Sequence, residues 1–454
     1  MKTLIQNGTV VNASGSRRAD VLLGNGRVLK VGPKLRASGA EVVDAEGCFV
    51  FPGFIDTHTH FDLDLGYTKT ADDFPSGTRA AVMGGTTTVL DFATQERGKP
   101  LQAALDTWHA KAQGSSCNYG FHMALAEWND KVASELPEMT RQGVTSYKMY
   151  MVYDGLKVDD GAVYAALKAA KKERALLGVH CENWEVLQRR VAEVKARGVT
   201  GPEGHPLSRP ADVEAEAVAR LMRIARLAEA PAYVVHLSTA EGLEEALRAR
   251  ARNQEVYLET CPQYLLLSDA CYRQADGAKF VMSPPLRAPS DSRALWQACA
   301  SGGIDAIGTD HCSFTMAQKA RGKDDFSLTP NGGAGVQHRA QLVFTHGVLA
   351  GKITLERMAE LLAFRPARLF GLEGRGVVEP GAAADVVVWD PVPRGMITDH
   401  NSAHNCDNSP FAGLEVRGGA RDVFLNGARV VNDWILSQTG AGRYLPRAGY
   451  EKLR

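Results

Sequence analysis

The sequence lacks long apolar runs and an excess of charge of either sign. No stretch reaches the roughly 18 uninterrupted apolar residues of a membrane span, and the opening MKTLIQNGTVVNASG lacks the apolar run of a signal peptide. Lys plus Arg and Asp plus Glu both number 52, so the formal net charge is zero. A nucleic-acid partner is not expected, because such proteins carry a basic excess or a basic face. We expect a cytoplasmic protein without a membrane span.

Paired cysteines and a dinucleotide-binding motif are also missing. The eight cysteines are scattered without a CxxC pair, which predicts mostly buried free thiols in a reducing compartment. No GxGxxG motif opens the first strand-helix unit, so a dinucleotide-binding sheet gets no support. The 454 residues are 44% hydrophobic and 23% charged, which is the composition of a globular protein with a large core.

The two ends of the chain resemble one another. Residues 4–12 and 423–432 both place β-forming residues around Asn-Gly, the strongest short-range signal of a β-hairpin. Further strand signals lie at 20–24, 27–31, 41–44 and 384–389. We expect residues 1–50 and 373–454 to form one small β-sandwich domain. The alternative is a pair of unrelated hairpins.

The middle of the chain, residues 51–372, alternates between short apolar strands and Ala/Leu/Glu/Arg-rich helices. Strand signals lie at 55–60, 86–92, 119–124, 146–151, 177–181, 232–237, 256–260 and 304–308. Helical signals include 159–174, 183–196, 210–228 and 239–251. Sustained alternation with about eight strands predicts an α/β fold, a (β/α)₈ TIM-like barrel, as the catalytic domain. In such a barrel the chemistry lies at the carboxyl ends of the strands.

Ligand-type side chains occur where several of these strands end. They are His58 and His60 in DTHTH, His180 after LGV, His236 after YVV, and Asp310 after IDAIGT. Residues i and i+2 of a strand point to the same face, so the two histidines of HxH can converge on one metal ion. A lone buried histidine is usually a core residue whose ring is hydrogen-bonded within the protein. Five such residues predicted at one rim favour a metal site.

Lys148 lies inside the apolar strand SYKMYM. A lysine there is a costly buried cation unless it is paired or neutralised. One interpretation is an ion pair with a nearby carboxylate. The other is carboxylation by CO₂, which converts the cation into an anion able to bridge two metal ions.

In its motifs the chain resembles the dihydropyrimidinase/hydantoinase family of cyclic amidohydrolases over nearly its full length. The stretches that carry the resemblance are FIDTHTHF (54–61), SGTRAA (76–81), GGTTT (84–88), YKMYM (147–151), HCEN (180–183), ETCPQYL (259–265), MSPPLR (282–287), GTDHC (308–312) and PNG (330–332). The resemblance implies metal-dependent hydrolysis of the cyclic amide bond of dihydropyrimidines or 5-substituted hydantoins, giving N-carbamoyl amino acids.

The resemblance also implies the metal centre. Two divalent ions, expected to be Zn²⁺ although the site type also accepts manganese or cobalt, would share carboxylated Lys148. One ion would take His58, His60 and Asp310, and the other would take His180 and His236. A hydroxide that bridges the two ions would be the nucleophile.

The same resemblance implies roles around the substrate, a small cyclic ureide or imide. Tyr153 matches a tyrosine that donates a hydrogen bond to the developing oxyanion. Asp310 would act as general base and then as general acid. Ser283 and Asn331 match positions whose backbone groups hold the ring edge.

Two residues depart from the family pattern. Asp64, in a loop that is usually more apolar, either favours a polar ring substituent or points to solvent. Gln337 stands where a glutamate is usual, and it could shift substrate preference or loop packing. Of the neighbours of Asp310, His311 either orients that carboxylate or makes a structural hydrogen bond, and Cys312 is expected to line the pocket without an activated thiolate.

Other functions within and outside this class stay open. Allantoin, dihydroorotate or another N-acyl or ureido compound could be the substrate, although no positively charged partner for the dihydroorotate carboxylate is evident. A non-catalytic scaffold homologue is disfavoured, because a scaffold does not need the complete ligand set. Relatives are commonly tetramers, so we expect a homotetramer or homodimer, with residues 436–450 as a tail or an interface arm.

Overall fold

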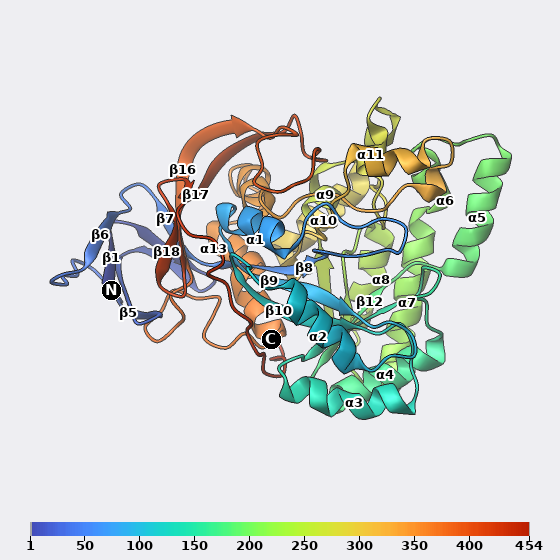
Figure 1. The fold of residues 1–454 in the computed structure, drawn as a ribbon, viewed down its shortest axis with the longest axis horizontal. Coiled ribbons are helices and arrows are strands. Elements are labelled where there is room, and N and C mark those ends of the chain that lie inside the picture. The colour runs from blue at the N-terminus through green and yellow to red at the C-terminus, as the bar shows by residue number, and fades with distance from the viewer. Residues whose placement is uncertain (1, 454) are drawn as a thin grey trace.

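The computed structural model describes residues 2–453, which form a strand-rich region and a helix-rich region. Figure 1 shows the sheets built from the chain ends at the left and a barrel of strands surrounded by helices at the right. None of the helices within residues 2–453 has the length and apolar character needed to cross a membrane. All eight cysteines are free thiols and seven of them are buried, as predicted.

Eight parallel strands form the barrel in the order in which they occur along the chain. They are β8 (Phe54–Thr59), β9 (Thr86–Thr94), β10 (Asn118–Ala124), β11 (Ser146–Tyr150), β12 (Leu176–His180), β13 (Ala232–Val234), β14 (Val256–Thr260) and β15 (Ala306–Ile307). The ring closes where Thr59 bridges His311 and the His60 N–H donates to the His311 carbonyl at 2.8 Å. The strands are buried along almost their whole length, as expected for a parallel sheet covered by helices. The predicted barrel is confirmed.

Helices cover the outside of the barrel and begin at capping residues. The Asp159 carboxylate accepts from the Ala162 N–H at 2.8 Å, so α4 begins at Asp160. The α-helices are α1 (Phe74–Met83), α2 (Leu101–Lys111), α3 (Asp130–Arg141), α4 (Asp160–Lys172), α5 (Trp184–Ala196), α6 (Gly204–Ser208), α7 (Ala211–Ala228), α8 (Ala240–Arg250), α9 (Pro262–Leu266), α10 (Pro289–Ser301), α11 (Met316–Lys319), α12 (Arg339–Val343), α13 (Leu355–Ala359) and α14 (Arg365–Leu369). Short 3₁₀ segments are η1 (Asp269–Arg273), η2 (Gly277–Phe280), η3 (Ala320–Gly322) and η4 (Phe326–Leu328), and π-helical segments are η5 (Phe344–Val348) and η6 (Glu360–Phe364).

Two sheets from the chain ends pack against each other beside the barrel. One has the order β5 (Arg27–Gly32), β4 (Asp20–Gly24), β1 (Lys2–Gln6), β6 (Glu41–Asp44). The other has the order β19 (Ile435–Leu436), β18 (Ala428–Asn432), β17 (Glu415–Leu425), β16 (Val386–Met396), β7 (Phe49–Pro52), β2 (Thr9–Asn12), β3 (Gly15–Arg18). Ile5, Val21, Val50, Val386 and Phe424 share one buried cluster between them. Both chain ends therefore build one sandwich, while the boundaries 50/51 and 372/373 stay a prediction.

The predicted hairpin at residues 4–12 is wrong. β1 pairs with β4 and β6 in the first sheet, whereas β2 pairs with β3 and β7 in the second. At the turn the Asn7 N–H donates to an Asp20 carboxylate oxygen at 2.9 Å, so the chain crosses from one sheet to the other. At the other end the prediction is confirmed, because β17 and β18 pair across Asn426-Gly427. An Asn-Gly turn fixes the local backbone but not the partner of each flanking strand.

The last residues of the chain run along the barrel. The Tyr119 N–H donates to the Arg443 carbonyl at 3.0 Å, and the Leu445 N–H donates back to the Tyr119 carbonyl at 2.8 Å. Farther on, the Tyr450 N–H donates to the Arg174 carbonyl at 3.1 Å. This segment therefore packs as a tail on its own barrel.

Candidate active site

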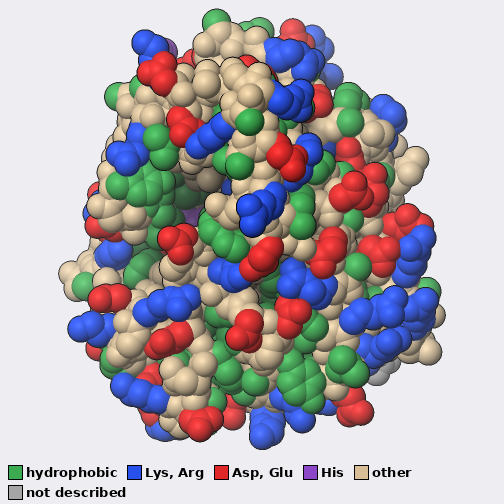
Figure 2. Space-filling model, turned by 90° about the vertical axis from the view of Figure 1, so that its right-hand side faces the viewer, with side chains coloured by type: hydrophobic (Ala, Val, Ile, Leu, Met, Phe, Trp, Pro, Cys, Tyr) green, Lys and Arg blue, Asp and Glu red, His purple; other side chains and the backbone are tan. Residues whose placement is uncertain are grey.

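The predicted ligands come together at the carboxyl ends of the barrel strands. His58 lies in β8 and His60 follows it directly, Lys148 lies in β11, His180 ends β12, His236 follows β13, and Asp310 follows β15. Figure 2 shows a hollow on the face turned away from the chain-end sheets, with histidine visible at its base. The structure thus places all six at one site, as the strand-end rule predicts.

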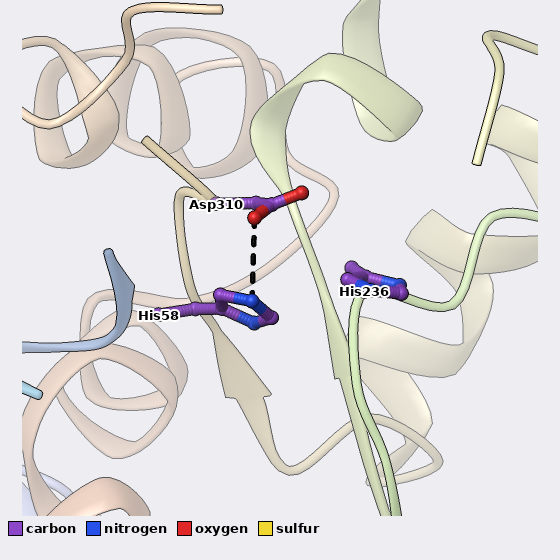
Figure 3. Close-up of side chains that lie close together, drawn as sticks. All are labelled: His58, His236 and Asp310. Carbon is purple, nitrogen blue, oxygen red and sulfur yellow. Dashed lines mark ion pairs between the residues drawn. The ribbon is translucent and has the colours of Figure 1, made fainter. Parts of the chain in front are cut away.

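Their donor atoms are close enough to share metal ions. One Asp310 carboxylate oxygen, Oδ1, lies 3.2 Å from both His58 Nε2 and His60 Nε2. Lys148 Nζ lies 3.0 Å from His58 Nε2, and the rings of His180 and His236 have centroids 4.5 Å apart. Donor atoms of His58, His236 and Asp310, drawn in Figure 3, all lie within 4.8 Å of one another.

Buried carboxylates bind the imidazole rings of two of these histidines. Glu259 in β14 lies 2.7 Å from His58 Nδ1, accepts from the His236 N–H at 3.2 Å and also accepts from the Tyr233 hydroxyl at 3.0 Å. Glu182, two residues after β12, lies 2.7 Å from His180 Nε2 and pairs with Arg209 at 2.6 Å. Each carboxylate occupies one ring nitrogen, so the other nitrogen of that ring is left for a ligand in the site.

Burial sets the charge states at the site. It lowers the pKa of His58, His180 and His236, so these rings are neutral near pH 7 and keep a lone pair for a metal ion. Burial also lowers the pKa of Lys148 to about 8. The Lys148 ammonium lies over the Phe92 ring, 4.3 Å from its centroid, and no carboxylate of residues 2–453 forms an ion pair with it. Attraction to Asp310 and Glu259 partly offsets the effect of burial on this pKa, although neither carboxylate forms a salt bridge with Lys148.

Three site residues have backbones in the left-handed region, which non-glycine residues rarely adopt. The φ angles are 77° at Tyr153, 39° at His236 and 53° at Asp310. Such conformations cost of the order of 1–3 kcal/mol each and persist only where the surroundings fix them. Asp56 provides part of that constraint, because its carboxylate accepts both the N–H (3.0 Å) and the hydroxyl (2.7 Å) of Thr309, next to Asp310.

A cavity of about 520 Å³ opens above this cluster. Its lining includes Tyr153, Ser283 and Asn331, the three predicted substrate-binding residues. The Tyr153 ring lies 5.1 Å from the His180 ring, and burial raises the Tyr153 pKa, so its hydroxyl stays protonated and able to donate. Cys312 also lines the cavity, and burial raises the pKa of its thiol, as expected of an inert cysteine.

The two departures from the family pattern have different environments. Asp64 lines the cavity, but its side chain is exposed and accepts from the Gly66 N–H at 2.7 Å in a local turn. Gln337 accepts from the Ala403 N–H at 2.7 Å, which anchors the loop between β16 and β17. Gln337 therefore acts in loop packing.

His311 makes structural hydrogen bonds on both ring nitrogens. Its Nε2 lies 3.1 Å from the Asp72 carboxylate, and its Nδ1 accepts from the Gly335 N–H at 3.0 Å. The ring is therefore held with the proton on Nε2, and it ties the turn after β15 to the loop before α1.

Sequence reasoning missed the roles of Glu259 and Glu182. Both are acidic residues at or just past the carboxyl end of an apolar strand, so the rule that selected the ligands also selects them. In the sequence they stand only as letters of the longer motifs ETCPQYL and HCEN. Their histidine partners become visible only in the folded chain.

The donor set fits divalent metal ions of the zinc type. Neutral imidazoles and a carboxylate are the nitrogen and oxygen ligands that such ions take. The buried His236 Nδ1 has no hydrogen-bond partner within residues 2–453. Lys148, whose pKa burial lowers to about 8, lies beside this ligand set without a salt bridge.

Comparisons with known proteins agree with this geometry. The sequence model of the amidohydrolase family matches residues 49–430. A D-hydantoinase from Geobacillus stearothermophilus is 42% identical over 100% of this chain and 98% of its own length, and a D-phenylhydantoinase from Escherichia coli (strain SE11) is 42% identical over 98% of each. The crystal structure of a dihydropyrimidinase from Brevibacillus agri NCHU1002 superposes with a TM-score of 0.98, at 40% identity and complete coverage of both chains. The chain therefore belongs to the amidohydrolase family, in its hydantoinase and dihydropyrimidinase group.

Proposed function

We propose that this protein hydrolyses the ring amide bond of 5-substituted hydantoins or dihydropyrimidines and releases N-carbamoyl amino acids. The observation that carries this proposal is the set of six ligand-type side chains at the base of a 520 Å³ cavity. The names of the relatives, D-hydantoinase, D-phenylhydantoinase and dihydropyrimidinase, support the substrate class. The two D-specific names favour the D-enantiomer.

We further propose that two divalent ions, expected to be Zn²⁺, occupy the site. His58, His60 and Asp310 would hold one ion, His180 and His236 would hold the other, and carboxylated Lys148 would bridge them. The family implies a divalent metal centre, and the Lys148 environment supports the modification. Reaction with CO₂ requires the neutral amine, and burial lowers the Lys148 pKa to about 8, which raises the share of that form. Bound metal ions would lower the pKa of water and polarise the ring carbonyl.

The chain's own residues complete the reaction. Asp310 is the group placed to hold the proton of the attacking water and return it to the leaving ring nitrogen. Burial raises its pKa, but His58 and His60 more than offset this, so the carboxylate is ionised and ready to accept. Tyr153 would donate a hydrogen bond to the oxygen that gains charge. Ser283 and Asn331 would hold the ring edge so that one carbonyl faces the metal ions.

Ring opening by the metal-loaded protein tests this proposal. We expect turnover of a 5-substituted hydantoin and of dihydrouracil, and none or much less of allantoin and dihydroorotate. If only allantoin or dihydroorotate is opened, the proposed reaction type would stand and the proposed substrate class would be wrong. No opening of any ring by a protein with two bound ions would overturn the proposed function.

Dihydroorotate is disfavoured by the charges around the cavity. Its carboxylate needs a free cation, and the lining contributes Arg97 and Lys148. The Arg97 guanidinium already donates to the carbonyls of Gly155 at 2.7 Å and Lys157 at 3.0 Å. Lys148 belongs to the proposed metal centre.

Compartment and assembly are also proposals. Eight free cysteines support a reducing, cytoplasmic location. The family resemblance implies a homotetramer or homodimer, which light scattering of the purified protein would test. A scattering mass equal to the 49.0 kDa monomer would overturn that assembly.

A further inference from the structure

Lys319, the last residue of α11, is buried without an acidic partner. It is 1% exposed, and its Nζ donates to the carbonyls of Val281 at 2.7 Å, Pro330 at 3.0 Å and Gly332 at 2.6 Å. No Asp or Glu of residues 2–453 is among its partners. An ammonium group has three N–H donors, so all three are used on main-chain carbonyls.

These carbonyls belong to the two segments that carry the proposed substrate-binding residues. Pro330 and Gly332 flank Asn331 on both sides, and Val281 lies two residues before Ser283. The Gly332 N–H also donates to the Val281 carbonyl at 3.0 Å, so the segments contact each other directly. Lys319 therefore joins residues 281–283 to residues 330–332.

Other buried side chains hold the same loop on either side of Ser283. His205 Nε2 lies 2.8 Å from the Met282 carbonyl, and the Tyr264 hydroxyl donates to the Pro284 carbonyl at 2.8 Å. The carbonyls before and after Ser283 are thus occupied within the protein. Ser283 itself lines the cavity, and its buried hydroxyl has no hydrogen-bond partner within residues 2–453.

We propose that Lys319 is a positioning residue for substrate recognition, and that it fixes the separation and orientation of Ser283 and Asn331. This inference rests on the proposed function, because it assigns Lys319 to the ring-edge contacts of that reaction. A buried ammonium is costly, and a packed apolar side chain of similar length would avoid that cost. The three charge-assisted hydrogen bonds offset the cost and specify one geometry for both segments.

The position of Lys319 predicts which kinetic constant it controls. Lys319 contacts none of the six proposed metal ligands, so metal content should not depend on it. Under the proposed function, the two segments that Lys319 joins would hold the ring edge of the substrate in both the ground state and the transition state. Loss of such contacts raises KM more than it lowers kcat.

The first test compares Lys319→Met with wild type, both metal-loaded, on a 5-substituted hydantoin. We expect KM to rise about tenfold, which corresponds to about 1.4 kcal/mol, with kcat within about threefold and unchanged metal content. Lys279→Met is the matched control. Lys279 is also buried and lies two residues before Val281, but it pairs with Asp276 at 2.6 Å. The KM of the Lys279→Met protein should stay at the wild-type value.

Two results would overturn the proposal. One is a folded Lys319→Met protein with wild-type KM, and the other is a joint fall of kcat and metal content. If Lys319→Met does not fold, Lys319→Gln replaces it, because the shorter, uncharged amide has only two N–H donors and must lose at least one of the three bonds. An unchanged KM in Lys319→Gln would then contradict the proposal.

Hydrogen exchange gives a second readout that does not depend on turnover. In Lys319→Met the peptides that cover 281–284 and 330–332 should exchange faster than in wild type, while α7 (Ala211–Ala228) should not change. Equal exchange in both proteins would overturn the positioning role. If wild type opens no ring, the proposed function fails, and the exchange data still decide whether Lys319 joins the two segments.

Discussion

At the scale of single residues, the site depends on acidic side chains that never reach the cavity. Glu259 and Glu182 each take one nitrogen of a histidine ring, which fixes the tautomer and the direction of the remaining lone pair. A histidine without that constraint could present either nitrogen, and metal affinity would fall. This role gives a physical reason for two fully buried carboxylates at the site.

Glu259→Gln tests this explanation. The amide keeps the volume of the carboxylate but removes the charge opposite His58 Nδ1, so we expect metal affinity to fall about 10- to 100-fold. Chelator competition would measure it. Glu255→Gln, at the start of the same strand region, is the control, since Glu255 accepts from Tyr257 at 2.7 Å away from the site. Equal metal affinity in both variants would contradict the role of Glu259.

Tyr153→Phe removes the proposed donor to the oxyanion. We expect kcat to fall about 100- to 1,000-fold with little change in KM, because the hydrogen bond forms fully only in the transition state. Steady-state kinetics on a hydantoin would show this. Tyr67→Phe is the control from the exposed side of the same cavity. A kcat within about threefold of wild type would exclude Tyr153 from this role.

Five of the six proposed ligands could be predicted from sequence because each lies where an apolar run ends, whereas Lys148 lies inside its strand and was assigned from the family resemblance. A strand of β-branched residues that stops at His180 or His236 indicates the rim of a barrel from the order of residues alone. The partners behind the ligands could not be predicted in this way. His58 and Glu259 are 201 residues apart, and only the closed barrel brings them within 2.7 Å. Lys319 could not be predicted either, because its partners are main-chain carbonyls, which leave no pattern in the side chains.

At the scale of elements, the strands and helices of the barrel follow their sequence signals closely. The strand predicted at 256–260 is β14, and the helix predicted at 210–228 is α7 within one residue. The pairing partners of the strands in the chain-end sheets were less predictable. The same Asn-Gly signal gives a hairpin at Asn426 but a crossing between sheets at Asn7, because strand partners depend on segments far away in the chain.

Gly427→Ala tests the hairpin between β17 and β18. The φ angle of Gly427 is 86°, and a Cβ there would lie 3.2 Å from Gly26 Cα, so we expect a loss of about 1–2 kcal/mol in the free energy of unfolding. Urea unfolding would measure it. Gly395→Ala in β16 is the control, because a Cβ there meets no atom within 4 Å. Equal stability of the two variants would contradict the assigned turn.

At the scale of the whole molecule, the proposed metal centre links distant parts of the barrel. Its ligands come from β8, β11 and β12 and from the turns after β13 and β15, so bound ions would tie opposite sides of the ring together. Ligands that bind only the folded state stabilise it by mass action. The metal centre should therefore contribute to stability as well as to turnover.

Metal removal tests that coupling. Dialysis against a chelator should abolish ring opening and lower the thermal midpoint, and added Zn²⁺ should restore both. At a free metal concentration of about 1,000 times Kd, the binding linkage amounts to about 4.1 kcal/mol. A metal-free protein, verified by elemental analysis, that keeps its midpoint and its activity would contradict the account.

The most direct test of the central claim is a parallel measurement of bound metal and hydantoin ring opening in wild type and Lys148→Ala. We predict two divalent ions per wild-type chain with turnover, and fewer ions with no detectable turnover in Lys148→Ala. Loss of both together would place Lys148 between the metal ions and the chemistry. A Lys148→Ala protein that retains two ions and wild-type turnover would contradict the proposed centre.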